Sequence, residues 1–242
     1  MIESITRIRV FLFWGKEAAF TEDLNSTLHR IRAVIFDVDG TLLDTEKLYM
    51  EAWRLAGAAA GYVVTHDVLL RTRAIPEKVG RGIFKEALGQ DFDYDTVRQE
   101  RIRIAEELIA ASDDLLKPGT KTVLDCLKSK GIPMAVASST GTQKTVAHLD
   151  HAGILEYFDA VVGGDMVELG KPNPHIFWKA ADLLGVPYGD CLVVGDTPAD
   201  VKAGTAAGMQ VLLIPDQVPA NEETTALSLA VLPQIDRMLE LL

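Results

Sequence analysis

The chain has 242 residues, of which 48% are hydrophobic and 24% charged, a globular composition that excludes a mainly disordered, collagen-like or coiled-coil architecture. Its 24 basic and 35 acidic residues give a net charge of −11, so a broad nucleic-acid-binding surface is not expected, although a single cleft can still bind an anion. Cys126 and Cys191 lie far apart in apolar runs, which excludes a disulfide framework, and no apolar run is long enough to span a membrane.

Residues 1–30 fit no part of the pattern that follows and are treated as an N-terminal extension of unknown role. The apolar stretch at residues 8–14 is short and has no small-residue cleavage site behind it, so we do not interpret it as a signal peptide. We therefore expect a cytoplasmic protein, either a monomer or a weak homodimer.

Short apolar runs rich in Val and Ile recur along the rest of the chain, as is typical of strands buried on both faces. Helical segments lie between the last four runs, and each segment ends at a glycine. The expected strands are residues 33–36, 134–137, 160–162, 191–194 and 210–214, and the helices between them are 142–152, 174–184 and 198–207. This alternation predicts an α/β protein, a Rossmann-like parallel sheet with helices on both faces.

Residues 45–116 contain no comparable strand and have apolar residues at helical spacing, such as Val97, Ile102 and Ile109. The expected helices here are residues 47–60, 77–88 and 94–111. The sequence therefore predicts a helical insertion after the first strand, with residues 31–44 and 117–242 forming the core.

The strongest chemical motif follows the first expected strand and reads Asp37-Val38-Asp39-Gly40-Thr41. In open parallel sheets ligands bind at the carboxyl ends of the strands, which is where Asp37 and Asp39 would lie. The alternative interpretation is turn chemistry at a strand end, which Asp-Gly commonly supplies.

Polar residues follow three other expected strands. Asp196 and Asp200 come after residues 191–194, where an acidic helix start is the alternative interpretation. Ser138 and Ser139 precede a helix start and could bind an anion or serve as simple caps. Lys171 lies between Gly170 and Pro172, a place where a solvated lysine is also common. Several carboxylates at one sheet edge would repel one another unless a hard divalent cation such as Mg²⁺ joined them.

These motifs, in this order and over residues 31–242, resemble the haloacid dehalogenase superfamily, in its phosphatase and phosphomutase branch with an α-helical cap. The resemblance implies that Asp37 is a nucleophile and that Asp39 is the acid and base. It implies phosphate binding by Ser138, Ser139 and Lys171. It also implies Mg²⁺ binding by Asp37, the Asp39 carbonyl and Asp196, with support from Asp200 and Thr41. Residues 45–116 would be the cap.

The resemblance implies a Mg²⁺-dependent phosphatase acting on a small phosphorylated metabolite, such as a sugar phosphate or a phosphoglycolate-like compound, with no nucleic-acid or membrane partner. One alternative is a β-phosphoglucomutase-like mutase, although Tyr49 stands where a mutase would be expected to have histidine. A catalytically idle binding protein is the other alternative, although no motif residue is lost. A basic cluster in the insertion either reaches the leaving group or is a solvated helix face; it comprises Arg71, Arg73, Lys78 and Arg81.

Overall fold

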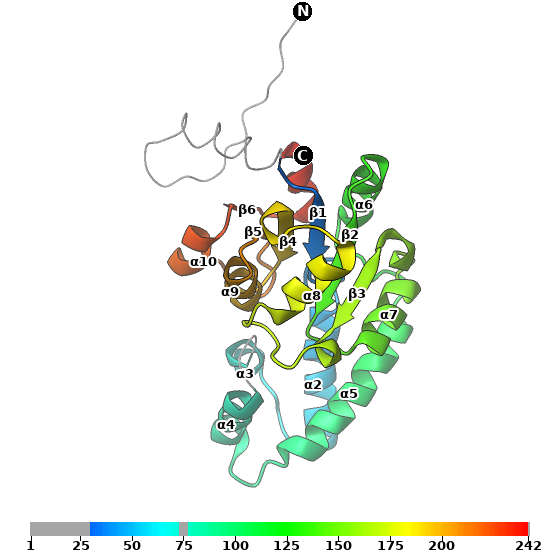
Figure 1. The fold of residues 1–242 in the computed structure, drawn as a ribbon. Coiled ribbons are helices and arrows are strands. Elements are labelled where there is room, and N and C mark those ends of the chain that lie inside the picture. Colours follow the sequence, from blue (N-terminus) through cyan, green and yellow to red (C-terminus); the bar gives the residue numbers. More distant parts are fainter. Residues whose placement is uncertain (1–29, 73–76, 242) are drawn as a thin grey trace, which may run out of the picture.

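A single parallel sheet forms the centre of the molecule in a computed structural model that describes residues 30–72 and 77–241. Its strand order is β3-β2-β1-β4-β5-β6, and every neighbouring pair is parallel (Figure 1). The strands are β1 (Ala33–Phe36), β2 (Met134–Ser138), β3 (Ala160–Gly163), β4 (Cys191–Gly195), β5 (Gln210–Leu213) and β6 (Ala230–Val231). The first strand, β1, therefore lies inside the sheet between β2 and β4, and the last strand, β6, lies at an edge.

Helices cover both faces of the sheet because the side chains of each strand alternate between two apolar clusters. Val34 and Phe36 of β1 join the cluster on one face, whereas Ala33 and Ile35 join the cluster on the other face. The core helices are α6 (Thr120–Ser129), α7 (Thr142–His151), α8 (His175–Leu184), α9 (Pro198–Ala206) and α10 (Glu222–Leu227), with short 3-10 helices at Leu155–Tyr157, Gly164–Met166, Tyr188–Asp190 and Ile235–Glu240. The expected Rossmann-like α/β fold is confirmed.

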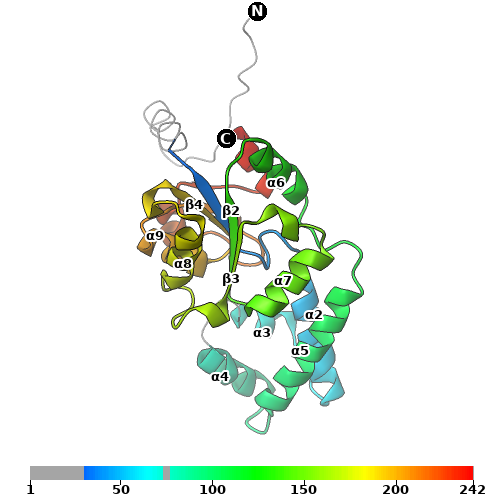
Figure 2. The same ribbon diagram turned by 45° about the vertical axis from the view of Figure 1, so that its right-hand side comes forward.

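A helical insert follows β1, as the sequence predicts. It consists of α2 (Glu46–Ala59), α3 (His66–Arg71), α4 (Glu77–Leu88) and α5 (Tyr94–Ala110). The long helices α2 and α5 run side by side below the sheet (Figure 2). The insert has its own aromatic core, in which the ring centroids of Trp53 and Phe84 lie 4.4 Å apart and those of Phe84 and Phe92 lie 5.6 Å apart.

The two connections between the insert and the sheet are hydrogen-bonded to each other. Leu43 forms an antiparallel bridge with Leu116, the amide of Asp44 donates to the Leu115 carbonyl at 2.7 Å, and the amide of Lys117 donates to the Leu42 carbonyl at 2.9 Å. The chain therefore enters and leaves the insert at one place.

The structure differs from the expectations in short elements. Helices α3 and α10 have six residues each and β6 has two, too few for a periodic pattern to be recognised. The ten-residue helix α6 is also absent from the expected elements. Residues 1–29 and Arg73 lie outside the described residues. None of the helices in the described ranges has the length and apolar character that crossing a membrane requires.

Candidate active site

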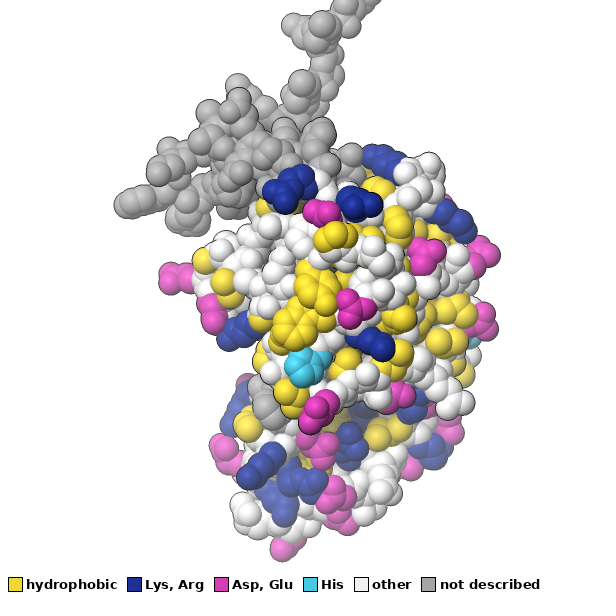
Figure 3. Space-filling view, in the orientation of Figure 1, with side chains coloured by type: hydrophobic (Ala, Val, Ile, Leu, Met, Phe, Trp, Pro, Cys, Tyr) yellow, Lys and Arg dark blue, Asp and Glu magenta, His cyan; other side chains and the backbone are white. Residues whose placement is uncertain are grey.

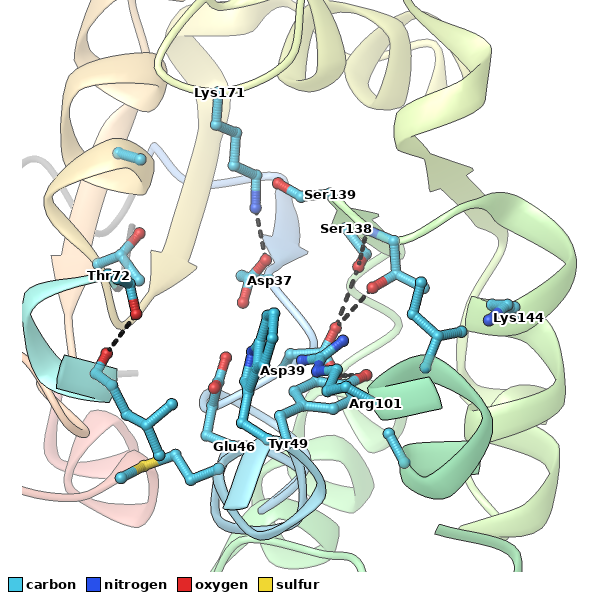
Figure 4. Close-up of a pocket in the computed structure, with 18 of the residues that line it drawn as sticks. Asp37, Asp39, Glu46, Tyr49, Thr72, Arg101, Ser138, Ser139, Lys144 and Lys171 are labelled. Carbon is cyan, nitrogen blue, oxygen red and sulfur yellow. Dashed lines mark hydrogen bonds and ion pairs between the residues drawn. The ribbon is translucent and has the colours of Figure 1, made fainter. Parts of the chain in front are cut away.

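A cavity of about 820 Å³ lies between the carboxyl edge of the sheet and the helical insert. The parallel register pairs Phe36 with both Val136 and Val194, so β1, β2 and β4 end side by side at this edge. In the space-filling view the surface is indented where the core meets the insert, and charged side chains of both signs border the indentation (Figure 3). The cavity is lined by core residues that include Asp37 and Lys171, and by residues of α2 and α5 (Figure 4).

Three buried carboxylates and one lysine lie at the inner end of this cavity. One carboxylate oxygen from each of Asp37, Asp196 and Asp200 lies within 4.8 Å of the others. The Lys171 ammonium lies 2.5 Å from Asp37 Oδ1 and 2.7 Å from Asp200 Oδ1. The hydroxyl of Thr41 donates to Asp196 Oδ1 at 3.2 Å. Residues that are up to 163 positions apart in the chain are thus brought together, because Asp37 and Asp200 follow neighbouring strands.

The acidic residues of this group repel one another in a site that water hardly reaches. Burial raises the pKa of Asp37 to about 7, although its ion pair with Lys171 opposes the rise. Burial, together with Asp37 and Asp200, also raises the pKa of Asp196 well above its usual value. Burial alone would lower the pKa of Lys171, but Asp200 and Asp37 outweigh that effect and raise it. The oxygen-only ligands and their mutual repulsion suit a hard divalent cation, and this is the one carboxylate group of its kind among the described residues.

Asp200 both caps the start of α9 and forms an ion pair with Lys171. Its Oδ2 accepts hydrogen bonds from the Thr197 amide at 3.1 Å and from the Thr197 hydroxyl at 2.5 Å, while the Thr197 hydroxyl accepts from the Asp200 amide. This capping box begins α9 and leaves Asp200 Oδ1 directed at Lys171. The helix-start interpretation and the site interpretation of Asp200 therefore both describe what the structure contains.

Asp39 is turned away from this carboxylate group and toward the insert. Its Oδ1 accepts from the hydroxyls of Thr45 at 2.6 Å and Tyr49 at 3.0 Å, and its Oδ2 accepts from the hydroxyl of Thr140 at 3.1 Å. Ser138 Oγ lies 3.5 Å from the same Oδ2. Burial and the Asp39 charge raise the pKa of Tyr49, so its hydroxyl stays protonated and donates to Asp39. Sequence analysis did not identify Thr140 or Thr45 as partners of Asp39.

The expected site residues gather in or beside the cavity. Those that line it are Asp37, Asp39, Ser138, Ser139, Lys171 and Asp200. Asp196 and Thr41 lie directly behind them, joined by the hydrogen bond between the two. Ser139 is exposed at the cavity wall and lies close to Lys171 (Figure 4).

Arg71, Lys78 and Arg81, the described members of the expected basic cluster, do not line the cavity. Arg71 pairs with Glu86 at 3.3 Å, and Arg81 pairs with Asp95 at 2.5 Å, so they are bound to other parts of the insert, and Lys78 is exposed. Among the described residues, the arginines that line the cavity are Arg98 and Arg101 of α5, which the sequence analysis did not identify. Their spacing of three residues, with Ile102 and Ala105 on the same face of the helix, is the pattern that could have identified them.

The chain is similar to known hydrolases in sequence, and its fold is similar to that of a solved relative. The family model described as haloacid dehalogenase-like hydrolase matches residues 31–208. A phosphorylated carbohydrates phosphatase of Thermotoga maritima is 36% identical over 182 residues, which are 74% of this chain and 83% of that protein. A phosphoglycolate phosphatase of Escherichia coli O157:H7 is 29% identical, covering 76% of this chain and 81% of its own. The crystal structure of a putative beta-phosphoglucomutase from Thermotoga maritima is 29% identical with a TM-score of 0.72, covering 86% and 97%.

Gly40 is predicted to be required for the position of Asp196. Its φ of +90° disfavours any side chain, and a Cβ there would lie 2.5 Å from Asp196 Oδ2. Gly61 is a matched control, because its φ is +83° but a Cβ would meet nothing within 4 Å. Gly61→Ala should lower the free energy of unfolding by about 1–2 kcal/mol from backbone strain alone, and Gly40→Ala by more. Denaturant unfolding measures both, and equal losses would contradict the predicted clash.

Proposed function

The chain belongs to the haloacid dehalogenase-like hydrolase family, and within it we propose a Mg²⁺-dependent phosphatase that hydrolyses a small phosphorylated metabolite through a phospho-aspartate intermediate. The protein is a phosphoric monoester hydrolase, in keeping with the phosphatases to which it is similar. The observation that carries the proposed mechanism is the buried Asp37, which lies at the inner end of the cavity with Lys171 at 2.5 Å.

In the proposed reaction, Asp37 attacks phosphorus through a carboxylate oxygen, and the bond from phosphorus to the leaving oxygen breaks. Asp39 gives a proton to that oxygen and then removes one from the water that attacks the phospho-aspartate. The Lys171 ammonium stabilises the negative charge that Asp37 and the phosphoryl oxygens bring together. Ser138 and Ser139 are assigned to the phosphoryl oxygens, since both line the cavity, and Ser139 lies beside this lysine.

The residues around Asp37 fit a divalent cation. Asp37 and Asp196 would hold it together with the Asp39 carbonyl, and Asp200, whose carboxylate belongs to the same group, would support it through Lys171. When bound, the cation supplies positive charge that offsets the repulsion between the nucleophile and the phosphoryl group. Thr41 orients Asp196 for this purpose through its hydrogen bond of 3.2 Å.

We assign residues 31–44 and 117–242 to a catalytic core and residues 45–116 to a cap that contributes substrate contacts. The support for this assignment is the separate aromatic core of the insert and its place across the cavity from Asp37. The substrate class that we propose is a sugar phosphate or a phosphoglycolate-like compound, on the likeness to the two phosphatases.

A phosphomutase is the second candidate function, and the likeness to a putative beta-phosphoglucomutase structure favours it. Tyr49 favours hydrolysis instead. It occupies the place where a mutase is expected to have histidine, and its protonated hydroxyl donates a hydrogen bond to Asp39 at 3.0 Å.

Asp37→Asn should abolish turnover, because the amide has nearly the same shape but is a far weaker nucleophile. The expected loss in kcat is at least about 10³-fold. Phosphate release measures it, and circular dichroism checks that the variant is folded. Asp91→Asn, an exposed carboxylate between α4 and α5, is the control and should keep full activity. Rapid phosphate release from folded Asp37→Asn would exclude the assigned nucleophile.

Chelation should stop phosphate release, and Mg²⁺ or Mn²⁺ should restore it, with Zn²⁺ less effective at a site of oxygen ligands. Mg²⁺ should also raise the melting temperature of the wild type, because it binds the folded state, and Asp196→Asn should reduce that rise. The exposed Asp165 offers the control variant Asp165→Asn. Full activity in excess chelator would contradict the metal requirement.

Water, rather than a sugar hydroxyl, should attack the phospho-aspartate. Incubation with β-glucose 1-phosphate and a trace of the 1,6-bisphosphate should yield free phosphate or no product. Coupled assays for phosphate and for glucose 6-phosphate separate the two outcomes. Accumulation of glucose 6-phosphate faster than phosphate would replace the hydrolase with the mutase.

A further inference from the structure

Arg101 differs from the other cations that line the cavity because it has no acidic partner within ion-pairing distance among the described residues. Lys171 pairs with Asp37 and Asp200, Lys144 pairs with Glu106 at 2.5 Å, and Arg98 pairs with Glu77 at 3.4 Å. Arg101 makes its contacts with aromatic rings instead, and its buried Nε has no hydrogen-bond partner among the described residues.

Aromatic packing holds the Arg101 guanidinium at the cavity wall. Its central carbon lies 4.5 Å from the centroid of the Tyr49 ring and 5.9 Å from that of the Trp53 ring. Figure 4 shows the guanidinium beside Tyr49, whose hydroxyl is hydrogen-bonded to Asp39. Stacking of this kind uses the face of the group and fixes its plane, while its N–H edge remains able to bind a carboxylate or a phosphate through two parallel hydrogen bonds.

The surroundings of Arg101 favour an anion. Burial lowers its pKa, which reflects the free-energy cost of removing the cation from water, and an arginine remains charged despite that cost. Glu46 and Asp39 act on it only through longer-range attraction, and neither is within ion-pairing distance. An anionic ligand would supply the missing partner.

The position of Arg101 identifies which part of a substrate that anion belongs to. Tyr49, whose ring supports Arg101, donates its hydroxyl to Asp39, the residue assigned to the leaving oxygen. The transferred phosphoryl group is assigned to Lys171, which forms an ion pair with Asp37. Arg101 is therefore on the leaving-group side of the cavity.

We propose that Arg101 is a specificity-determining residue that binds a second anionic group, a carboxylate or a phosphate, on the leaving group of the substrate. This inference rests on the proposed function and narrows it to phosphorylated acids or bisphosphates, in preference to monophosphates of neutral polyols.

Matched substrate pairs test the inference and distinguish the two anions. Phosphoglycolate and 2-hydroxyethyl phosphate differ by a carboxylate, and fructose 1,6-bisphosphate and fructose 1-phosphate differ by a phosphate. The wild type should prefer the anionic member of one pair by at least about 10-fold in kcat/KM, because a hydrogen bond between charged groups contributes a free energy that corresponds to such a factor. The pair that shows the preference identifies the anion.

Arg101→Gln should remove that preference, with a loss of at least about 10-fold on the anionic member and about threefold or less on the neutral one. Arg101→Lys keeps the positive charge but loses the planar guanidinium that can donate two parallel hydrogen bonds. Its preference for the anionic substrate should lie between those of the wild type and Arg101→Gln. Arg103→Gln is the control, since Arg103 lies on the same helix, is exposed and pairs with Glu100. Equal losses on both members of a pair, or a wild type without an anionic preference, would overturn the inference and leave the phosphatase function standing.

Binding separates this inference from the proposed function. Calorimetry on Asp37→Asn should give tighter binding of the anionic member than of the neutral one, and the double variant with Arg101→Gln should lose the difference. The wild type could hydrolyse no compound of either pair while Asp37→Asn still binds the anionic compound more tightly than the neutral one. That result would contradict the proposed phosphatase function and leave the anion site standing. If the binding difference is absent, the anion site is wrong.

Discussion

The ion pairs of Lys171 with Asp37 and Asp200 are the interaction on which the active-site end of the sheet depends. Three carboxylates are almost fully withdrawn from water here, with exposed fractions of 7% for Asp37 and 1% for both Asp196 and Asp200. Burying such charges without compensation costs several kcal/mol each. Lys171 compensates part of this charge because it lies between Asp37 and Asp200. The negative charge that remains on the three carboxylates suits a bound cation. The small residues Gly40 and Gly195 make room for this grouping, since a Cβ at either would meet Asp196 or Asp200 within 3 Å.

The cavity joins two surfaces of different character. The sheet edge presents its charged groups on rigid strand ends whose backbones are held by neighbouring strands, as where the Asp37 amide donates to the Val194 carbonyl at 2.8 Å. The insert presents longer side chains from helices, among them Tyr49 and Arg101. Polar contacts cross between the two surfaces, both at Tyr49 with Asp39 and at Glu106 with His148, 3.1 Å apart. In the proposed function, residues at the sheet edge carry out the reaction and residues on the helices of the insert select the substrate.

Much of the architecture could be predicted from the sequence because its signals are local. The strands of the sheet are buried on both faces, so β1 and β4 appear as continuous apolar runs, and the polar residues after them mark the edge that carries the candidate site. The substrate side of the cavity could not be predicted in this way. Whether Arg81 or Arg101 faces the cavity depends on how α4 and α5 are rotated about their axes, and apolar spacing did not resolve that. The direction of the Asp39 side chain depends on Thr45, Tyr49 and Thr140, whose positions are set by tertiary packing.

The paired connections beside Leu43 and Leu116 constrain how the insert can move. Two crossings that are hydrogen-bonded to each other act as one short axis, so a rotation there carries α2 and α5 together and leaves the aromatic core of the insert unchanged. Tyr49 and Arg101 lie on those two helices, so such a rotation would break the Tyr49 contact with Asp39 and withdraw Arg101 from the cavity in a single event. The proposed selection of the leaving group by Arg101 and the proposed proton transfer by Asp39 would thereby be mechanically linked, although Tyr49 and Arg101 lie 52 positions apart in the chain.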